Sequence, residues 1–231
     1  MLFRSDLRLQ NPDLLAEIDA NPFYTAEVGD GINPSTMVDR INVPVFIAGA
    51  WQDEQTGGHF PAFLDKFTSS PQVYVTLTNG LHTESLAPSI FPRYAEFLSL
   101  YVARKVPDLG AASIISPILS SSITGVSVAL PQANRFDGMT YDEALAMFEG
   151  EPKVRVLFEE GAADGQTAGS PLARWQAEFD AWPIAETEIV RMNLGADGTL
   201  STANSTGSTS YTADPTRSEE HTSELQSRGL I

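Results

Sequence analysis

The sequence predicts an α/β domain followed by an all-β domain. Two apolar runs, 43–51 and 72–78, are each followed by a stretch of helical spacing, at 59–67 and 90–106. Strands and helices that alternate at this pitch indicate a largely parallel sheet covered by helices. From residue 153 onward the apolar residues instead recur at every second position, which is typical of antiparallel strands with one solvated face.

The first expected element is a short helix that begins near Asp13, because the Asn-Pro-Asp sequence at 11–13 is a suitable N-terminal cap. A turn-rich segment at 29–34 follows it. The run 43–51 (VPVFIAGAW) is then apolar throughout, and such a run favours a strand buried on both faces of a parallel sheet. Pro44 fits only at the beginning of that strand, because proline has no N–H to give to a sheet ladder.

Helices are expected to cover this sheet. The stretch 59–67 places its large apolar residues on one stripe, and 90–106 repeats the same spacing. These residues are Phe60, Phe63, Leu64 and Phe67 in the first stretch and Tyr94, Phe97, Leu98, Tyr101 and Val102 in the second. Between the two stretches, 72–78 is rich in β-branched residues and predicts a second strand, which ends in the polar loop 79–84.

The pattern changes after Pro107. Three consecutive serines at 120–122, with scattered glycine and proline, predict a connecting region over 107–152. Within it, Thr140 and Glu143 have the spacing of a capping box and predict a short helix that ends by residue 150.

The all-β part is predicted over 153–216. Apolar residues alternate in three segments, which are 154–158, 175–181 and 190–194. The sequence Ala-Asp-Gly-Thr at 196–199 predicts a hairpin turn, because Asp-Gly tolerates the positive φ angles that such turns need. This half therefore predicts the first part of a jelly-roll β-sandwich.

Composition excludes several classes of function. The 231 residues include 30 Asp and Glu, 14 Lys and Arg and no cysteine, with a net charge of −16. A nucleic-acid partner is not expected, because affinity for phosphates comes from clustered Lys and Arg. The absence of cysteine removes disulfides, thiolate metal sites and cysteine nucleophiles. No apolar run reaches the length of a membrane span, so no membrane partner is expected.

Two residues follow the predicted strands directly. Asp53 comes after the first strand and His82 after the second. Reactive groups of open α/β sheets lie in the loops at the carboxyl ends of strands. The chain order Asp then His matches the last two members of an α/β-hydrolase triad, in which the carboxylate orients the imidazole and the imidazole activates a serine. The alternative is that Asp53 is a turn residue and His82 an ordinary loop histidine.

The segment 43–53 (VPVFIAGAWQD) resembles the P-V-φ-φ-x-G-G-W-x-D strand of the cocaine esterase/NonD family, where φ is apolar and the aspartate is the triad acid. The segment 77–82 (LTNGLH) occupies the place of that family's strand-to-histidine loop, although Asn79 and Leu81 depart from its usual Pro and Trp. The paired motifs at 174–183 and 194–200 are similar to the family's C-terminal jelly roll, which Xaa-Pro dipeptidyl-peptidases share.

The resemblance implies that Asp53 is the triad acid and His82 the general base, with no metal or cofactor. The family's nucleophile lies in a Gly-x-Ser-Tyr-x-Gly elbow upstream of the acid, and this sequence contains no such motif. Residues 125–129 (GVSVA) resemble an elbow superficially, but they follow the histidine and predict a strand. Glu54 is a second candidate acid, displaced by one residue from the family position.

Both ends of the chain resemble translated sequencing-library adapter, at 1–5 and 217–231. We therefore expect the remainder to be an internal part of a longer protein. The expected organisation along the chain is the end of a helical cap region at 6–38, the C-terminal part of an α/β-hydrolase domain at 39–106, the connecting region at 107–152 and a partial jelly-roll domain at 153–216.

The function that follows is part of a serine hydrolase that cleaves a small-molecule ester, an amide or a short peptide through an acyl-enzyme. This part would supply the acid and the histidine without the nucleophile, and would be inactive alone. Two alternatives stay open, an Xaa-Pro dipeptidyl-peptidase and a non-catalytic carbohydrate-binding β-sandwich. The sequence predicts neither the compartment nor the oligomeric state.

Overall fold

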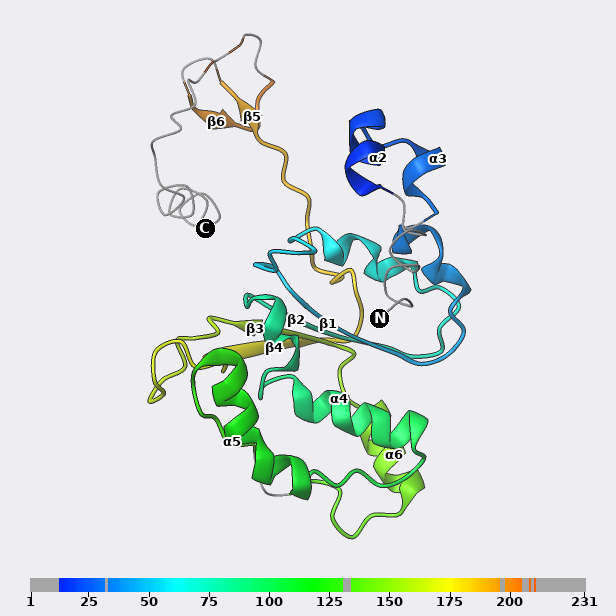
Figure 1. The fold of residues 1–231 in the computed structure, drawn as a ribbon, viewed down its shortest axis with the longest axis vertical. Helices are drawn as coiled ribbons and strands as arrows, with labels where there is room; N and C mark the ends of the chain where they lie inside the picture. The colour runs from blue at the N-terminus through cyan, green and yellow to red at the C-terminus, as the bar shows by residue number, and fades with distance from the viewer. Residues whose placement is uncertain are drawn as a thin grey trace, which may run out of the picture. The chain divides into compact units, whose positions relative to one another are not determined.

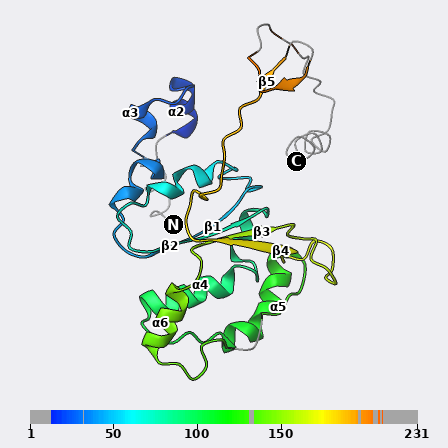
Figure 2. The same ribbon diagram turned by 180° about the vertical axis from the view of Figure 1, so that it is seen from behind.

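The structure is a computed structural model that describes residues 13–31, 33–130, 134–195, 198–204, 208 and 210. The chain divides into two compact units, Met1–Ala185 and Glu186–Ile231. The first unit holds a four-stranded sheet with its helices, and the second holds a two-stranded hairpin (Figures 1 and 2). An α/β-type fold is thus confirmed, with a mixed sheet at its centre.

The sheet of the first unit has the strand order β1-β2-β3-β4. Its strands are β1 (Val45–Ala50), β2 (Val73–Thr78), β3 (Val154–Phe158) and β4 (Trp175–Phe179). The first three are parallel, and β4 is antiparallel to β3. The two strands predicted at 43–51 and 72–78 are confirmed, and they are neighbours in register, with Val45 opposite Val73.

The two parallel strands β1 and β2 differ in burial. Five of the six residues of β2 are buried, because β2 lies between β1 and β3. In β1 only Ala50 is buried and the others are half-buried, because β1 is the edge strand of the described sheet. The prediction that 43–51 is buried on both faces was therefore wrong for the described residues.

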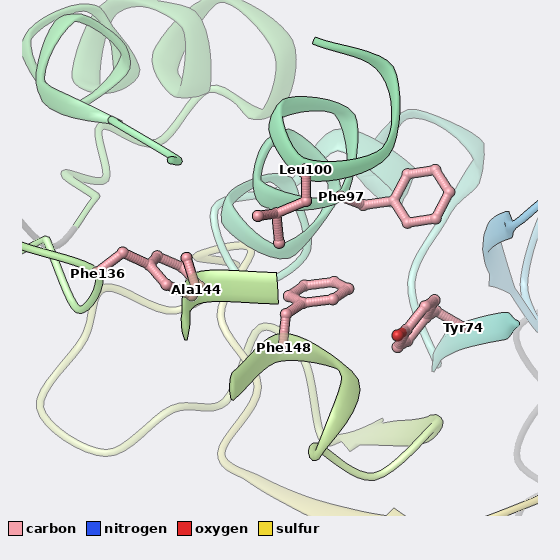
Figure 3. Close-up of a cluster of buried hydrophobic side chains, with 6 residues drawn as sticks. All are labelled: Tyr74, Phe97, Leu100, Phe136, Ala144 and Phe148. Carbon is pink, nitrogen blue, oxygen red and sulfur yellow. The ribbon is translucent and has the colours of Figure 1, made fainter. Parts of the chain in front are cut away.

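One face of the sheet is covered by helices α4 (Phe91–Phe97) and α6 (Tyr141–Glu149) and the π-helical turn η5 (Leu98–Val102). The buried cluster on this face is Tyr74, Phe97, Leu100, Phe136, Ala144 and Phe148 (Figure 3). The Phe148 ring lies 4.8 Å from that of Tyr74, centroid to centroid. Both helices were predicted, and the predicted capping box of Thr140 and Glu143 opens α6.

The opposite face is covered by the 3-10 helix η3 (Phe60–Lys66), which forms within the stretch predicted to be helical. Its Leu64 is buried against the apolar side chains of β2 and β3, which are Val75, Leu77, Val154 and Val156. The indole of Trp182 packs on the same cluster, and its Nε1 donates to the Pro61 carbonyl at 3.1 Å.

Helix α5 (Gly110–Thr124) lies where a connecting region was predicted. Its buried residues are Ser113, Ser116 and Ser120. Their hydroxyls donate to nearby carbonyls, and Ser116 Oγ also accepts from the Leu130 backbone. The buried serines therefore face inward with their hydroxyls hydrogen-bonded, which satisfies polar groups that would be costly to bury unpaired.

The predicted domain boundary at residue 153 is not seen. Strand β3 pairs with β2, so 154–179 belongs to the α/β sheet and not to a separate sandwich. The second unit contains the short antiparallel strands β5 (Asn193–Leu194) and β6 (Leu200–Ser201). A hairpin turn was predicted at 196–199, within the segment that joins them. Its Ala196 and Asp197 are outside the described residues.

The N-terminal part of the first unit contains short helices. These are α2 (Leu14–Ala20), α3 (Ala26–Gly29) and the 3-10 turns η1 (Pro34–Thr36) and η2 (Val38–Arg40). Helix α2 begins as predicted, with the Asp13 carboxylate accepting from the N–H groups of Leu15 and Ala16. Over the described part of the chain, no helix combines the length and the hydropathy that crossing a bilayer requires.

Candidate active site

The structure brings Asp53 and His82 together. His82 Nδ1 lies 2.8 Å from Asp53 Oδ2, within hydrogen-bond distance. The two residues follow the carboxyl ends of adjacent parallel strands, and these ends meet at one edge of the sheet. An ionised carboxylate only accepts hydrogen bonds, so the Nδ1 atom carries the proton. Nε2 is then the nitrogen through which a neutral His82 can accept a proton.

The Asp53 carboxylate is oriented by its own turn. Its Oδ1 accepts from the backbone N–H groups of Gln55 at 2.8 Å and Thr56 at 2.9 Å. The backbone carbonyl of Asp53 accepts from Gly57 at 3.0 Å and closes the turn. One carboxylate oxygen is thus held by the backbone, and the other is directed at the histidine.

His82 begins a 3-10 helix, η4 (His82–Leu86), within the loop predicted to be irregular. The Glu84 carboxylate closes the start of this helix by accepting from the Leu81 N–H at 2.7 Å. The loop is also joined to the loop that carries Asp53, because the Gln52 N–H donates to the Gly80 carbonyl at 3.2 Å. The two loops therefore form one hydrogen-bonded edge.

The local fields favour an ion pair between these side chains. The Thr56 backbone N–H, together with the His82 ring, holds the pKa of the Asp53 carboxyl well below its ordinary value. The hydrogen bond and the negative charge of Asp53 raise the pKa of His82 above that of a free imidazole. The Asp53 side chain is 9% exposed and the His82 side chain 43% exposed, so the imidazole can be reached from solvent.

A cavity of about 720 Å³ opens beside the pair. Apolar residues of β1 and η3 form much of its lining, including Ile47, Phe60 and Phe63. Asp53 and His82 lie at its wall. An apolar cavity with a few convergent polar groups is the usual setting of a small-molecule site.

The other residues that could carry chemistry lie outside the Asp53–His82 hydrogen bond. Glu54 Oε2 accepts from the His82 backbone N–H at 3.5 Å, and its charge adds a minor part to the rise in the pKa of His82. His59, the other histidine among the described residues, is at the N-cap of η3 and is exposed. Ser127, in the elbow-like sequence, is exposed in an irregular segment after α5, where a strand was predicted. Trp175 is 51% exposed and stacks on Phe158 at 3.9 Å between ring centroids.

Sequence reasoning missed a polar cluster behind the histidine loop. Glu160, just beyond β3, contacts Thr78, Asn79 and Ser89. No signal in the sequence could have found it, because Glu160 stands in a run of acidic and glycine residues that is typical of a solvated hairpin.

In the described ranges, His, Asp and Glu side chains do not gather in threes in any arrangement that could hold an ion. Comparisons of the chain with protein-family models, with curated proteins and with solved structures gave no match. Any functional conclusion therefore depends on the geometry of the site and on the sequence motifs.

Proposed function

We propose that this chain supplies the acid and the general base of a serine hydrolase of the cocaine esterase/NonD type. The observation that carries the proposal is the 2.8 Å contact between His82 Nδ1 and Asp53 Oδ2 at the ends of adjacent parallel strands. This is the acid–histidine geometry of a catalytic triad. The apolar cavity beside it supports an acyl-bearing substrate.

In the proposed reaction, a serine carried by sequence outside these 231 residues attacks the acyl carbon of an ester or amide. His82 takes the serine proton at Nε2 and then gives it to the departing alcohol or amine. Water deacylates the enzyme by the same route in reverse. Asp53 stays ionised throughout, because its pKa is lowered, and stabilises the imidazolium that forms.

The alternative of a carbohydrate-binding module rests on Trp175, whose exposed ring could stack on a sugar. Trp182, the other tryptophan of the 174–183 segment, packs instead on η3. We therefore favour the hydrolase. An Xaa-Pro dipeptidyl-peptidase would use the same acid–histidine pair, and only its substrate would differ.

Two assays test the proposal. The 231-residue chain should hydrolyse p-nitrophenyl esters no faster than its His82→Ala variant, because it lacks the expected nucleophile. A polypeptide that also contains the preceding coding sequence should react with a fluorophosphonate probe at one serine outside the 231 residues. His82→Ala should slow that labelling by about 10³-fold or more. The proposal is contradicted if His82→Ala leaves the rate of labelling unchanged. It is also contradicted if the 231-residue chain hydrolyses the esters and His82→Ala abolishes this turnover.

A further inference from the structure

Glu160 is a partly buried carboxyl group that the proposed chemistry does not use. It stands two residues beyond the end of β3, at the same edge of the sheet as the two loops of the site. Burial raises its pKa to about 7, and the nearby Glu84 charge adds to this rise. A carboxyl group is costly to bury unless hydrogen bonds satisfy it.

The partners of Glu160 lie at both ends of the histidine loop. At the beginning of the loop, the Thr78 hydroxyl donates to Glu160 Oε2, and the Glu160 N–H donates to Asn79 Oδ1 at 2.8 Å. At its end, the Ser89 hydroxyl donates to Glu160 Oε1 at 2.8 Å. His82 lies between these two anchoring points.

The contacts continue from Glu160 to the acid loop. The Thr78 hydroxyl that donates to Glu160 lies 3.3 Å from the Gly80 nitrogen, whose N–H it accepts. The Gly80 carbonyl in turn accepts from Gln52, the residue before Asp53. A continuous series of hydrogen bonds therefore runs from Glu160 to the neighbour of the acid.

The backbone leading to Glu160 is also unusual. Glu159 has φ = +52°, a left-handed conformation that non-glycine residues seldom adopt. Such conformations persist where the surrounding contacts fix them, and they cluster at functional sites. Here the turn at Glu159 brings the Glu160 N–H to Asn79 and its carboxylate to Thr78 and Ser89.

We propose that Glu160 is a positioning residue, which fixes both ends of the 79–89 loop and so holds the His82 imidazole against Asp53. Its importance for catalysis rests on the proposed function. The positioning itself does not, because it can be measured on the imidazole without any turnover.

The test is an NMR titration of the histidine rings in the 231-residue chain, with the His82 signals assigned from a His82→Gln variant. Glu160→Ala removes the ionisable group and its side-chain hydrogen bonds. Glu160→Gln removes the ionisable group but can still bond both hydroxyls, since an amide accepts and donates. Glu159→Gln is the matched control, because the Glu159 side chain is exposed and pairs with Arg174.

The pKa of His82 in Glu160→Ala should fall toward the ordinary histidine value of about 6.5, because the imidazole is no longer held against Asp53. Glu160→Gln and Glu159→Gln should keep the raised pKa. An equal fall in Glu160→Ala and Glu160→Gln would show a charge effect only and would overturn the proposal, as would no change in Glu160→Ala.

If Glu160→Ala does not fold, as judged from the His59 signal and thermal unfolding, Ser89→Ala decides the question. It removes one anchoring bond and should lower the pKa of His82 in the same direction by a smaller amount. An unchanged pKa in Ser89→Ala would overturn the proposal. The outcome of either titration is independent of whether the intact enzyme proves to be a serine hydrolase.

Discussion

The loop that carries Asp53 is fixed mainly by hydrogen bonds within itself, whereas the loop that carries His82 is also anchored by a residue far away in the sequence. Asp53 is fixed by backbone groups of the next four residues, Gln55, Thr56 and Gly57 among them. The His82 loop is anchored by Glu160, which comes 71 residues after Ser89 in the chain. The first loop needs only a local turn, and the second needs β3 to be docked in the sheet.

The Asp53 loop and the His82 loop should therefore differ in their sensitivity to substitutions elsewhere in the protein. A local turn tolerates distant substitutions, because its hydrogen bonds close within a few residues. A loop that depends on a tertiary hydrogen-bond network loses part of its support with each anchor that is removed. The acid should therefore keep its orientation in variants in which the histidine moves.

The largest loss of stability is expected from a substitution at Thr78, which anchors the His82 loop to Glu160. Thr78→Val replaces a fully buried hydroxyl that donates to Glu160. The Glu160 oxygen and the Gly80 N–H lose a partner, so the free energy of unfolding should fall by about 1–3 kcal/mol in urea denaturation. The pKa of His82 should fall in the same variant, because the histidine loop loses part of its anchoring.

Thr76→Val is the matched control for this substitution. Thr76 lies two residues earlier on β2, is equally buried, and its hydroxyl has no hydrogen-bond partner among the described residues. Valine has nearly the same shape and removes the unsatisfied group, so the protein should be unchanged or more stable by about 1 kcal/mol. If the free energy of unfolding falls equally in Thr78→Val and Thr76→Val, the contact with Glu160 contributes nothing to stability.

A smaller effect is expected from the turn that holds the acid. Gly57 has φ = +70° and has no atom within 4 Å of the position that a Cβ would occupy. Gly57→Ala should therefore cost only the left-handed backbone penalty, about 1–2 kcal/mol, measured by urea unfolding. Gly57→Asn should cost less, because asparagine tolerates this conformation. A larger loss in Gly57→Asn than in Gly57→Ala would show that space, and not backbone conformation, is limiting.

The sequence predicted the residues at strand ends more readily than the residues whose partners are distant in the chain. Asp53 and His82 were identified because each follows an apolar strand, and strand ends are visible in a single sequence. Glu160 and the serines of α5 were not identified, because their partners are set by tertiary packing. The assignment of β3 to a sandwich failed for the same reason. Alternating apolar residues predict a strand but do not say which sheet it joins.

The effect of Asp53→Asn is expected to be most specific at the site itself. Asparagine can still accept from the Gln55 and Thr56 N–H groups, so the turn should survive. It presents no negative charge to the imidazole, so the pKa of His82 should fall to about 6.5 or below in a histidine NMR titration. Glu54→Gln is the control and should leave most of the rise in place, because Asp53 is the main cause of it.

The pH dependence of stability should separate the wild type from Asp53→Asn in a defined window. The lowered pKa of Asp53 stabilises the fold above about pH 4, and this contribution is lost as the pH falls through its folded value. The raised pKa of His82 stabilises the fold fully below about pH 6.5, and this contribution is lost as the pH rises through its folded value. The difference in melting temperature should thus be greatest between about pH 4 and 6.5 and narrower at pH 9. A constant difference across this range would mean that the two side chains do not titrate as a pair.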